Sequence, residues 1–162
     1  MRIRKLNLLG FTLIELLITM AILGLLSALA VPSLEIVVKR HKEQELKNAL
    51  MEIRTAIDQY KQAVDQGKVT READESGYPP NLNVLYQGVL DTTDPNNQKK
   101  IYFLRRLPRD PFYPDNSANE AATWGKRSYE SSYDSPHEGK DVYDIYSMSP
   151  ELGINGIPYK KW

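Results

Sequence analysis

Histidine and cysteine, the residue types most often found at catalytic and metal centres, are scarce in this chain. It has two histidines and no cysteine, which excludes disulfides, cysteine nucleophiles and thiolate metal sites. Neither His41 nor His137 lies in a nucleophile motif such as G-x-S-x-G, and no G-x-x-x-x-G-K-[ST] phosphate loop is present. Basic and acidic residues balance at 21 each, so nothing indicates binding of nucleic acid. The sequence therefore predicts a protein that is not an enzyme.

One carboxylate has an unusual position. Glu15 lies immediately before residues 16–34, a stretch without any charged side chain. A charge within a membrane helix costs about 2.5–3.5 kcal/mol at the centre and less toward an end, and such residues usually serve a function. Glu15 is therefore the first candidate functional residue.

The uncharged stretch has the dimensions of a membrane helix. As an α-helix, residues 16–34 would be about 28 Å long, and the hydrocarbon core of a bilayer is about 30 Å thick. Residues 1–10 carry three basic side chains and no acid, like the start of a secretory signal. In one interpretation, signal peptidase cuts after Ala28-Leu29-Ala30 and releases a protein that begins at Val31. In the other, the cut precedes the stretch, and the apolar helix stays in the mature protein.

The pattern after the uncharged stretch favours the second interpretation. Apolar residues recur there at intervals of three or four, with charged residues between them, which indicates one face of an α-helix: Leu46, Leu50, Ile53, Ile57, Tyr60 and Val64. We predict a helix from Phe11 to about Gln66, with Gly67 as its stop. A disposable signal would not continue as a helix, and it would gain nothing from Glu15.

The residues around Glu15 form a recognisable motif. Gly10-Phe11-Thr12-Leu13-Ile14-Glu15 resembles the G-F-T-L-x-E processing site of type IV prepilins and type II secretion pseudopilins. The resemblance implies that prepilin peptidase cuts between Gly10 and Phe11 and then methylates the new amino terminus of Phe11. Gly10 has no β-carbon, which suits a protease that needs an extended, accessible backbone.

The resemblance also implies roles in assembly for Glu15, Phe11 and Pro32. Glu15 lies four residues after Phe11 on the same helix face, so its carboxylate would neutralise the Phe11 amine of a neighbouring subunit and set the axial register. The alternative places Glu15 unpaired at the level of the lipid headgroups. Pro32 matches a family proline that kinks or melts the helix, because proline removes a backbone hydrogen bond. Its alternative is simple tolerance of proline in a membrane helix.

The remainder of the chain predicts a small α+β part. Residues 67–80 and 91–100 are rich in turn formers and predict loops, while Asn81–Leu90 predicts a short helix. Strands of a small antiparallel sheet are predicted at Arg127–Tyr133, Asp141–Met148 and Ile157–Tyr159.

A second resemblance covers this part. Tyr78-Pro79-Pro80, residues 104–112 (LRRLPRDPF), Trp124-Gly125-Lys126 and residues 143–147 (YDIYS) are similar to segments of the G pseudopilin family, the major pseudopilins of type II secretion. That family carries calcium in a loop after its penultimate strand, which makes calcium a candidate cofactor. Calcium takes six to eight oxygen ligands, several of them carboxylates. The candidate ligands here are Glu151, Asn155 and Ser147, and the family's pair of aspartates is missing. Gly153, Asn155 and Gly156 can alternatively be read as turn residues.

These observations predict an α+β, type IV pilin-like fold, in which one long N-terminal helix, membrane-spanning in its first half, packs on a small antiparallel sheet. The predicted parts are a leader peptide at 1–10, an apolar transmembrane and filament-core helix at 11–38, its amphipathic continuation at 39–66, and a small periplasmic part at 67–162.

The resemblance implies a pseudopilin subunit of a type II secretion system that assembles into a periplasmic pseudopilus and drives protein export. It would be a single-pass protein of the bacterial inner membrane. Its partners would be other copies of itself, other pseudopilins, the prepilin peptidase, and the assembly platform with its secretion ATPase. A type IV pilus subunit is the alternative of the same class. A secreted or periplasmic binding domain cut after Ala30 is the alternative of another class.

Overall fold

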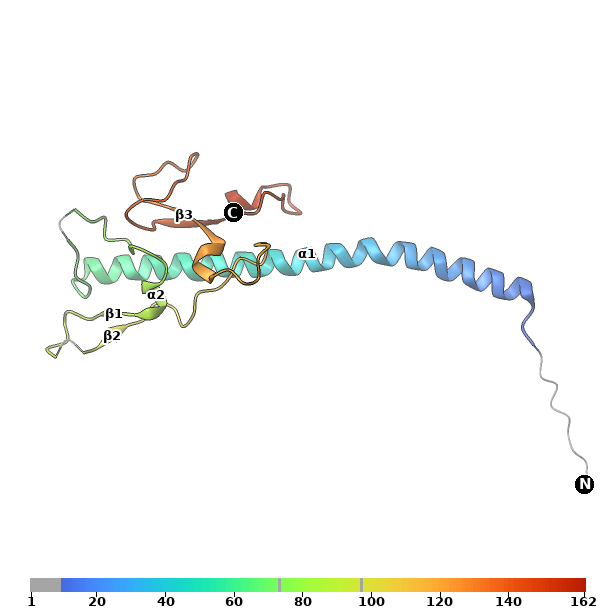
Figure 1. The fold of residues 1–162 in the computed structure, drawn as a ribbon, viewed down its shortest axis with the longest axis horizontal. Helices are drawn as coiled ribbons and strands as arrows, with labels where there is room; N and C mark the ends of the chain where they lie inside the picture. Colours follow the sequence, from blue (N-terminus) through green and yellow to red (C-terminus); the bar gives the residue numbers. More distant parts are fainter. Residues whose placement is uncertain (1–9, 73, 97) are drawn as a thin grey trace, which may run out of the picture. The chain divides into compact units, whose positions relative to one another are not determined.

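The computed structural model describes residues 10–72, 74–96 and 98–162, without the side chains of residues 29–34. The chain divides into a first unit, which ends at Lys39, and a compact second unit, Arg40–Trp162. Helix α1 (Leu13–Asp65) supplies residues to both units (Figure 1). The long helix predicted from Phe11 to about Gln66 is therefore confirmed, to within two residues at either end.

Local hydrogen bonds account for both ends of α1. At its start, the Thr12 hydroxyl oxygen accepts the backbone N–H of Glu15 at 3.2 Å, as a helix N-cap does. At its end, Gly67 adopts a φ of +71°, and the N–H groups of Gly67 and Lys68 bond back to the carbonyls of Val64 and Ala63. This pair of bonds is a Schellman motif, which requires the left-handed backbone that glycine adopts without strain.

The core of the second unit is built on the apolar stripe of α1. All six residues of the predicted stripe are buried, and Leu46 and Ile53 are completely so. Side chains from the rest of the unit cover them, mainly Leu82, Leu85, Leu104, Leu107, Trp124, Val142, Ile145 and Tyr159. The sequence therefore located the helix face around which the second unit folds.

Two small antiparallel sheets lie along this part of α1 (Figure 1). Helix α2 (Val84–Gln87) leads into β1 (Val89–Leu90), which pairs with β2 (Lys100–Ile101). The 3₁₀ helix η1 (Glu120–Thr123) leads into β3 (Trp124–Arg127), which pairs with β4 (Asp144–Ser147), and the 3₁₀ helix η2 (Tyr159–Lys161) follows. Gly125 on β3 faces Tyr146 on β4, and a Cβ at Gly125 would lie 2.3 Å from the Tyr146 ring. The predicted pilin-like α+β fold is confirmed, with two sheets in place of one.

The predicted strands are wrong in their boundaries. Residues 128–133 do not form a strand, because the chain turns at Ser128, whose carbonyl accepts the N–H of Ser131. The Asp141 carboxylate then accepts the N–H of Tyr129 at 2.8 Å, which holds the turn in place. Near the chain's end, residues 157–159 contribute a single bridge between Leu152 and Pro158 in place of a third strand.

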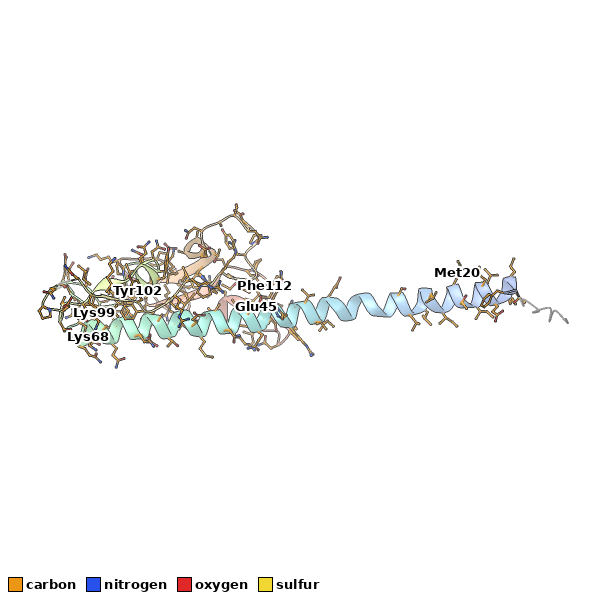
Figure 2. All side chains as sticks on the ribbon, turned by 90° about the horizontal axis from the view of Figure 1, so that it is seen from below. Met20, Glu45, Lys68, Lys99, Tyr102 and Phe112 are labelled. Atoms are coloured by element: carbon orange, nitrogen blue, oxygen red, sulfur yellow. The ribbon has the colours of Figure 1, made fainter. Side chains whose placement is uncertain are left out.

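In the first unit the structure describes residues 10–12 and the N-terminal part of α1. Among the side chains that the structure describes there, the large apolar ones are exposed on all faces of the helix, Met20 among them (Figure 2). Nowhere in the described residues does a helical stretch combine the length and apolar character needed to cross a membrane. The transmembrane segment predicted at 11–38 includes residues 29–34, whose side chains lie outside the described part, and it stays a prediction.

Candidate functional site

The predicted cleavage point lies just before α1. Gly10, Phe11 and Thr12 precede the helix, and Gly10 and Phe11 are exposed, Phe11 by 84%. A peptide bond outside regular structure can enter a protease groove in the extended form without unwinding a helix. Residues 1–9 of the predicted leader lie outside the described residues.

Glu15 lies in the first turn of α1 and is exposed. Its backbone N–H is the group bonded to Thr12, so Thr12-Leu13-Ile14-Glu15 has the sequence of a capping box. The sequence analysis missed this local role, although the T-x-x-E spacing was the signal for it. A carboxylate in the first helical turn is also stabilised by the positive end of the helix dipole. The position of Glu15 in the first turn therefore favours the helix in the single subunit, independent of any role between subunits.

The first turns of α1 have no apolar partner among the described residues. Ten large apolar side chains here are between 51% and 79% exposed: Leu13, Ile14, Leu16, Leu17, Ile18, Met20, Ile22, Leu23, Leu25 and Leu26. They cover every face of the helix. A helix that is apolar all round is stable when lipid or other helices surround it.

Pro32 lies within α1, which is helical on both sides of it. Its side chain is outside the described part of the chain. The predicted kink or melting at this position during assembly stays a prediction.

The structure does not group the three candidate calcium ligands as a metal site, and two of them are engaged in hydrogen bonds. Ser147 is buried, and its hydroxyl donates to Asp110 at 2.6 Å. The Asn155 side-chain oxygen accepts the N–H of Ile157 at 3.0 Å, which makes Asn155 a turn residue. Glu151 is exposed. Across residues 10–72, 74–96 and 98–162, no three acidic, histidine or cysteine side chains are grouped as metal ligands.

Asp110 belongs to the Leu-Pro-x-Asp-Pro segment that resembles the G pseudopilins. Its carboxylate accepts the Ser147 hydroxyl and, at 2.8 Å, the N–H of Phe112. Burial raises the pKa of Asp110 above its ordinary value, and these two hydrogen bonds oppose that shift. The Trp124 indole N–H donates to the Pro108 carbonyl at 2.9 Å. The segment thus fastens β3 and β4 to the core, a structural role.

Two charged residues of α1 hold the C-terminal segment, and the sequence analysis missed both. Glu43, 9% exposed, accepts the N–H of Ile154 at 2.7 Å and the hydroxyl of Tyr159 at 2.9 Å through the same oxygen, Oε1. Arg54 donates to the Asp144 carboxylate at 2.8 Å and to the carbonyls of Ile145 and Trp162. Nothing in the local sequence distinguishes them from other charged residues of an amphipathic helix.

Replacing Tyr159 with phenylalanine should change the response of stability to alkaline pH. Burial and the hydrogen bond to Glu43 raise the pKa of Tyr159, so the folded chain keeps this proton while the unfolded chain loses it near pH 10. Above pH 10 the unfolded state thus binds fewer protons, and the wild type should lose about 1.4 kcal/mol of stability per pH unit relative to Tyr159→Phe. Urea unfolding of both proteins between pH 8 and 11 measures this difference. If the free energies of unfolding of the two proteins changed with pH by the same amount over that range, the prediction would be contradicted.

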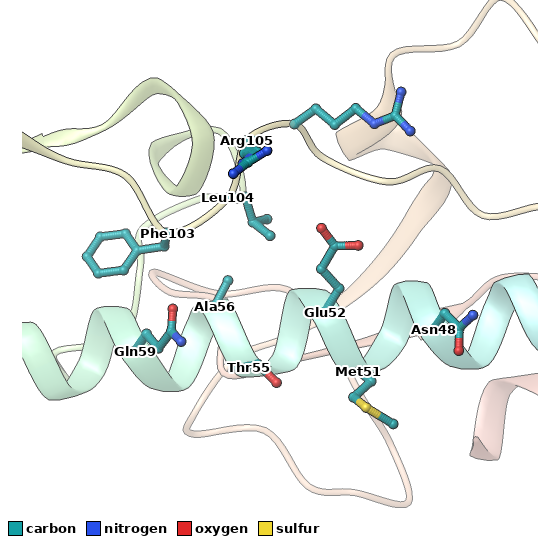
Figure 3. A pocket seen from close by; sticks show the side chains of 10 residues that line it. Asn48, Met51, Glu52, Thr55, Ala56, Gln59, Phe103, Leu104 and Arg105 are labelled. Atoms are coloured by element: carbon teal, nitrogen blue, oxygen red, sulfur yellow. The ribbon is translucent and has the colours of Figure 1, made fainter.

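An open groove runs beside α1 in the second unit (Figure 3). It has a volume of about 710 Å³ and lies between α1 and residues 103–106. Leu104 points toward the helix, and Met51 points away from this segment (Figure 3). The lining pairs no nucleophile with a base, so the groove offers no catalytic arrangement.

Three features together define a prepilin-like protein. They are a long N-terminal helix with exposed apolar faces, a compact α+β unit built on the second half of that helix, and the sequence Gly-Phe-Thr-Leu-Ile-Glu at the start of the helix. The family described as the prokaryotic N-terminal methylation motif matches residues 9–31. No solved structure matches the chain.

Curated relatives extend the match well beyond this motif. The type II secretion system core protein G of Pseudomonas aeruginosa is 32% identical over 106 residues, which cover 64% of this chain and 67% of that protein. The core protein G of Klebsiella pneumoniae is 29% identical, over 92% of this chain and 86% of that protein. The core protein G of Pectobacterium carotovorum is also 29% identical, over 88% of this chain and 76% of that protein. The chain belongs to the family of type II secretion system core protein G. This family is structural and not enzymatic, in agreement with the expectation from the sequence.

Proposed function

We propose that this chain is a filament-forming pseudopilin subunit that drives protein export by type II secretion. The observation that carries the proposal is the exposed apolar surface of α1 between Leu13 and Leu26. Burying one such side chain stabilises by about 1.5–3 kcal/mol, so this surface strongly favours an apolar environment. The second unit has its own core and does not need this part of the helix.

In this proposal, the residues just before α1 and in its first turn determine how the protein is matured and assembled. Prepilin peptidase cuts between Gly10 and Phe11 and methylates the Phe11 amine. The Glu15 carboxylate then pairs with that amine on a neighbouring copy and sets the register of the filament, because an unpaired charge among apolar helices is costly. Pro32 gives the helix a point at which it can bend or stretch during transfer.

Before assembly the subunit is held in the inner membrane by residues 11–38, with its C-terminal part in the periplasm. Moving an apolar helix from lipid to a bundle of helices gains little hydrophobic free energy, since both surroundings are apolar. The direction of growth must therefore come from an assembly platform and a secretion ATPase. Other copies of this chain and other pseudopilins are the remaining partners.

Sequencing the amino terminus of the mature protein tests the proposal against removal of an ordinary signal peptide. We expect Phe11 as the first residue, with a methyl group detected by mass spectrometry, when the chain is produced together with prepilin peptidase. The same chain without the peptidase should keep Gly10 and is the control. A mature protein that begins at Val31 would refute the filament function, because the apolar surface of α1 would then be lost.

A further inference from the structure

Residues 151–159 form a small loop closed by its own backbone. The Glu151 carbonyl accepts the N–H of Tyr159, and the Ile157 carbonyl accepts the N–H of Gly153 at 2.9 Å. Within the loop, the Gly153 carbonyl accepts the N–H of Gly156 at 2.8 Å. These oxygens are therefore already used in hydrogen bonds that shape the loop.

Two hydrogen-bond donors of this loop are directed at α1. The Ile154 N–H and the Tyr159 hydroxyl converge on one oxygen of Glu43, at 2.7 Å and 2.9 Å. Tyr159 is completely buried and Glu43 nearly so. A calcium site requires the reverse polarity, because the ion is surrounded by six to eight oxygen lone pairs. The point at which these two donors meet is thus suited to an anion.

The calcium ion implied by the family resemblance does not match these residues. Between Ser147 and Gly156 the chain has a single carboxylate, Glu151. The hydroxyl proton of Ser147 is directed at Asp110, and the side-chain oxygen of Asn155 already bonds the loop backbone. A divalent cation bound here would lack most of the carboxylate ligands that it needs.

We propose that the Glu43 carboxylate replaces calcium as the centre around which residues 151–159 fold, so that the C-terminal segment of this chain needs no divalent cation. The inference does not depend on filament assembly. It concerns the second unit alone, in which both Glu43 and the loop lie.

The first experiment is thermal unfolding of the full chain in a non-ionic detergent, with either a chelator or millimolar calcium chloride. We expect the same melting temperature in both and no heat of binding when calcium is titrated into the chelated protein. A ligand that binds the folded state raises the melting temperature. A higher melting temperature with calcium would therefore overturn the proposal.

The second experiment compares Glu43→Gln with Glu45→Gln. Glu45 lies on the same helix but is exposed and contacts His41, so its variant controls for loss of one negative charge (Figure 2). Glutamine keeps the shape of Glu43 but weakens the two charge-assisted hydrogen bonds. We expect hydrogen exchange of the Ile154 amide to become about tenfold faster in Glu43→Gln and to stay unchanged in Glu45→Gln.

A third variant covers the case in which Glu43→Gln does not fold. Tyr159→Phe removes one donor and leaves the Ile154 bond in place, so exchange at Ile154 should be faster than in wild type, but by less than about tenfold. Calcium should slow exchange in none of the variants. The role of Glu43 is refuted if exchange at Ile154 is as slow as in wild type in Glu43→Gln, or in Tyr159→Phe where Glu43→Gln does not fold. Protection restored by calcium in either variant would refute it as well.

Discussion

Glu15→Gln should abolish filament formation while cleavage before Phe11 continues. In the proposed filament, the variant leaves the Phe11 amine of a neighbouring copy without a counter-charge among apolar helices. Removing one partner of a buried ion pair costs about 3–5 kcal/mol, or a hundredfold or more in the affinity of each subunit contact. Electron microscopy of sheared filaments, with amino-terminal sequencing of the same samples, measures assembly and processing separately.

The choice of glutamine separates the charge from the helix cap. Glutamine, like glutamate, is found three residues after the N-cap in a capping box, so the cap of α1 at Thr12 should be preserved. Glu45→Gln is the matched control, because Glu45 is another exposed carboxylate of α1 and lies in the second unit, outside residues 11–38. Its filaments should be normal. Filaments of ordinary number and length from Glu15→Gln would show that register is set without this ion pair.

Ile53→Ala should destabilise the second unit by about 2–5 kcal/mol. Ile53 is completely buried in the core between α1 and the elements that cover it, and truncation leaves a cavity as well as removing apolar contacts. Typical domains are stable by about 5–15 kcal/mol, so a large part of the stability would be lost. Urea unfolding of the full chain in detergent, followed by the fluorescence of the buried Trp124, provides the measurement.

Met51→Ala is the control for helix propensity and side-chain size. Met51 lies two residues away on α1 but is 68% exposed, and surface substitutions usually change stability by less than about 0.5 kcal/mol. A similar loss of stability in the two variants would mean that the stripe of α1 is not the centre of the core.

The long helix and its buried face could be predicted because both depend on local pattern. Spacings of three and four residues place Leu46 to Val64 on one face, and the glycine at position 67 supplies the left-handed backbone of the helix stop. The boundaries of the strands could not be predicted in the same way, because they depend on contacts between residues far apart in the sequence. Tyr129, Ser131 and Tyr133 alternate like a strand, yet the bond from the Tyr129 N–H to Asp141, twelve residues away, favours a turn.

The two anchors on α1 illustrate the same limit for the candidate sites. Glu43 bonds to residues 111 and 116 positions away, and Arg54 to one 108 positions away. A charged residue between apolar positions of a helix normally lies on its solvated face. No spacing rule connects such a residue with a distant loop, so this part of the site required the three-dimensional structure.

The positions of these anchors also have a mechanical consequence. Glu43 and Arg54 are separated by about 16 Å along α1, at 1.5 Å per residue, and each ties the C-terminal segment to the helix. A force applied along the helix axis would act on both attachments at the same time and parallel to the helix. With a single attachment, the C-terminal residues could separate from the helix starting at one end. Because both attachments lie in the second unit, they should keep the residues near the C-terminus bound to α1 together rather than one after the other.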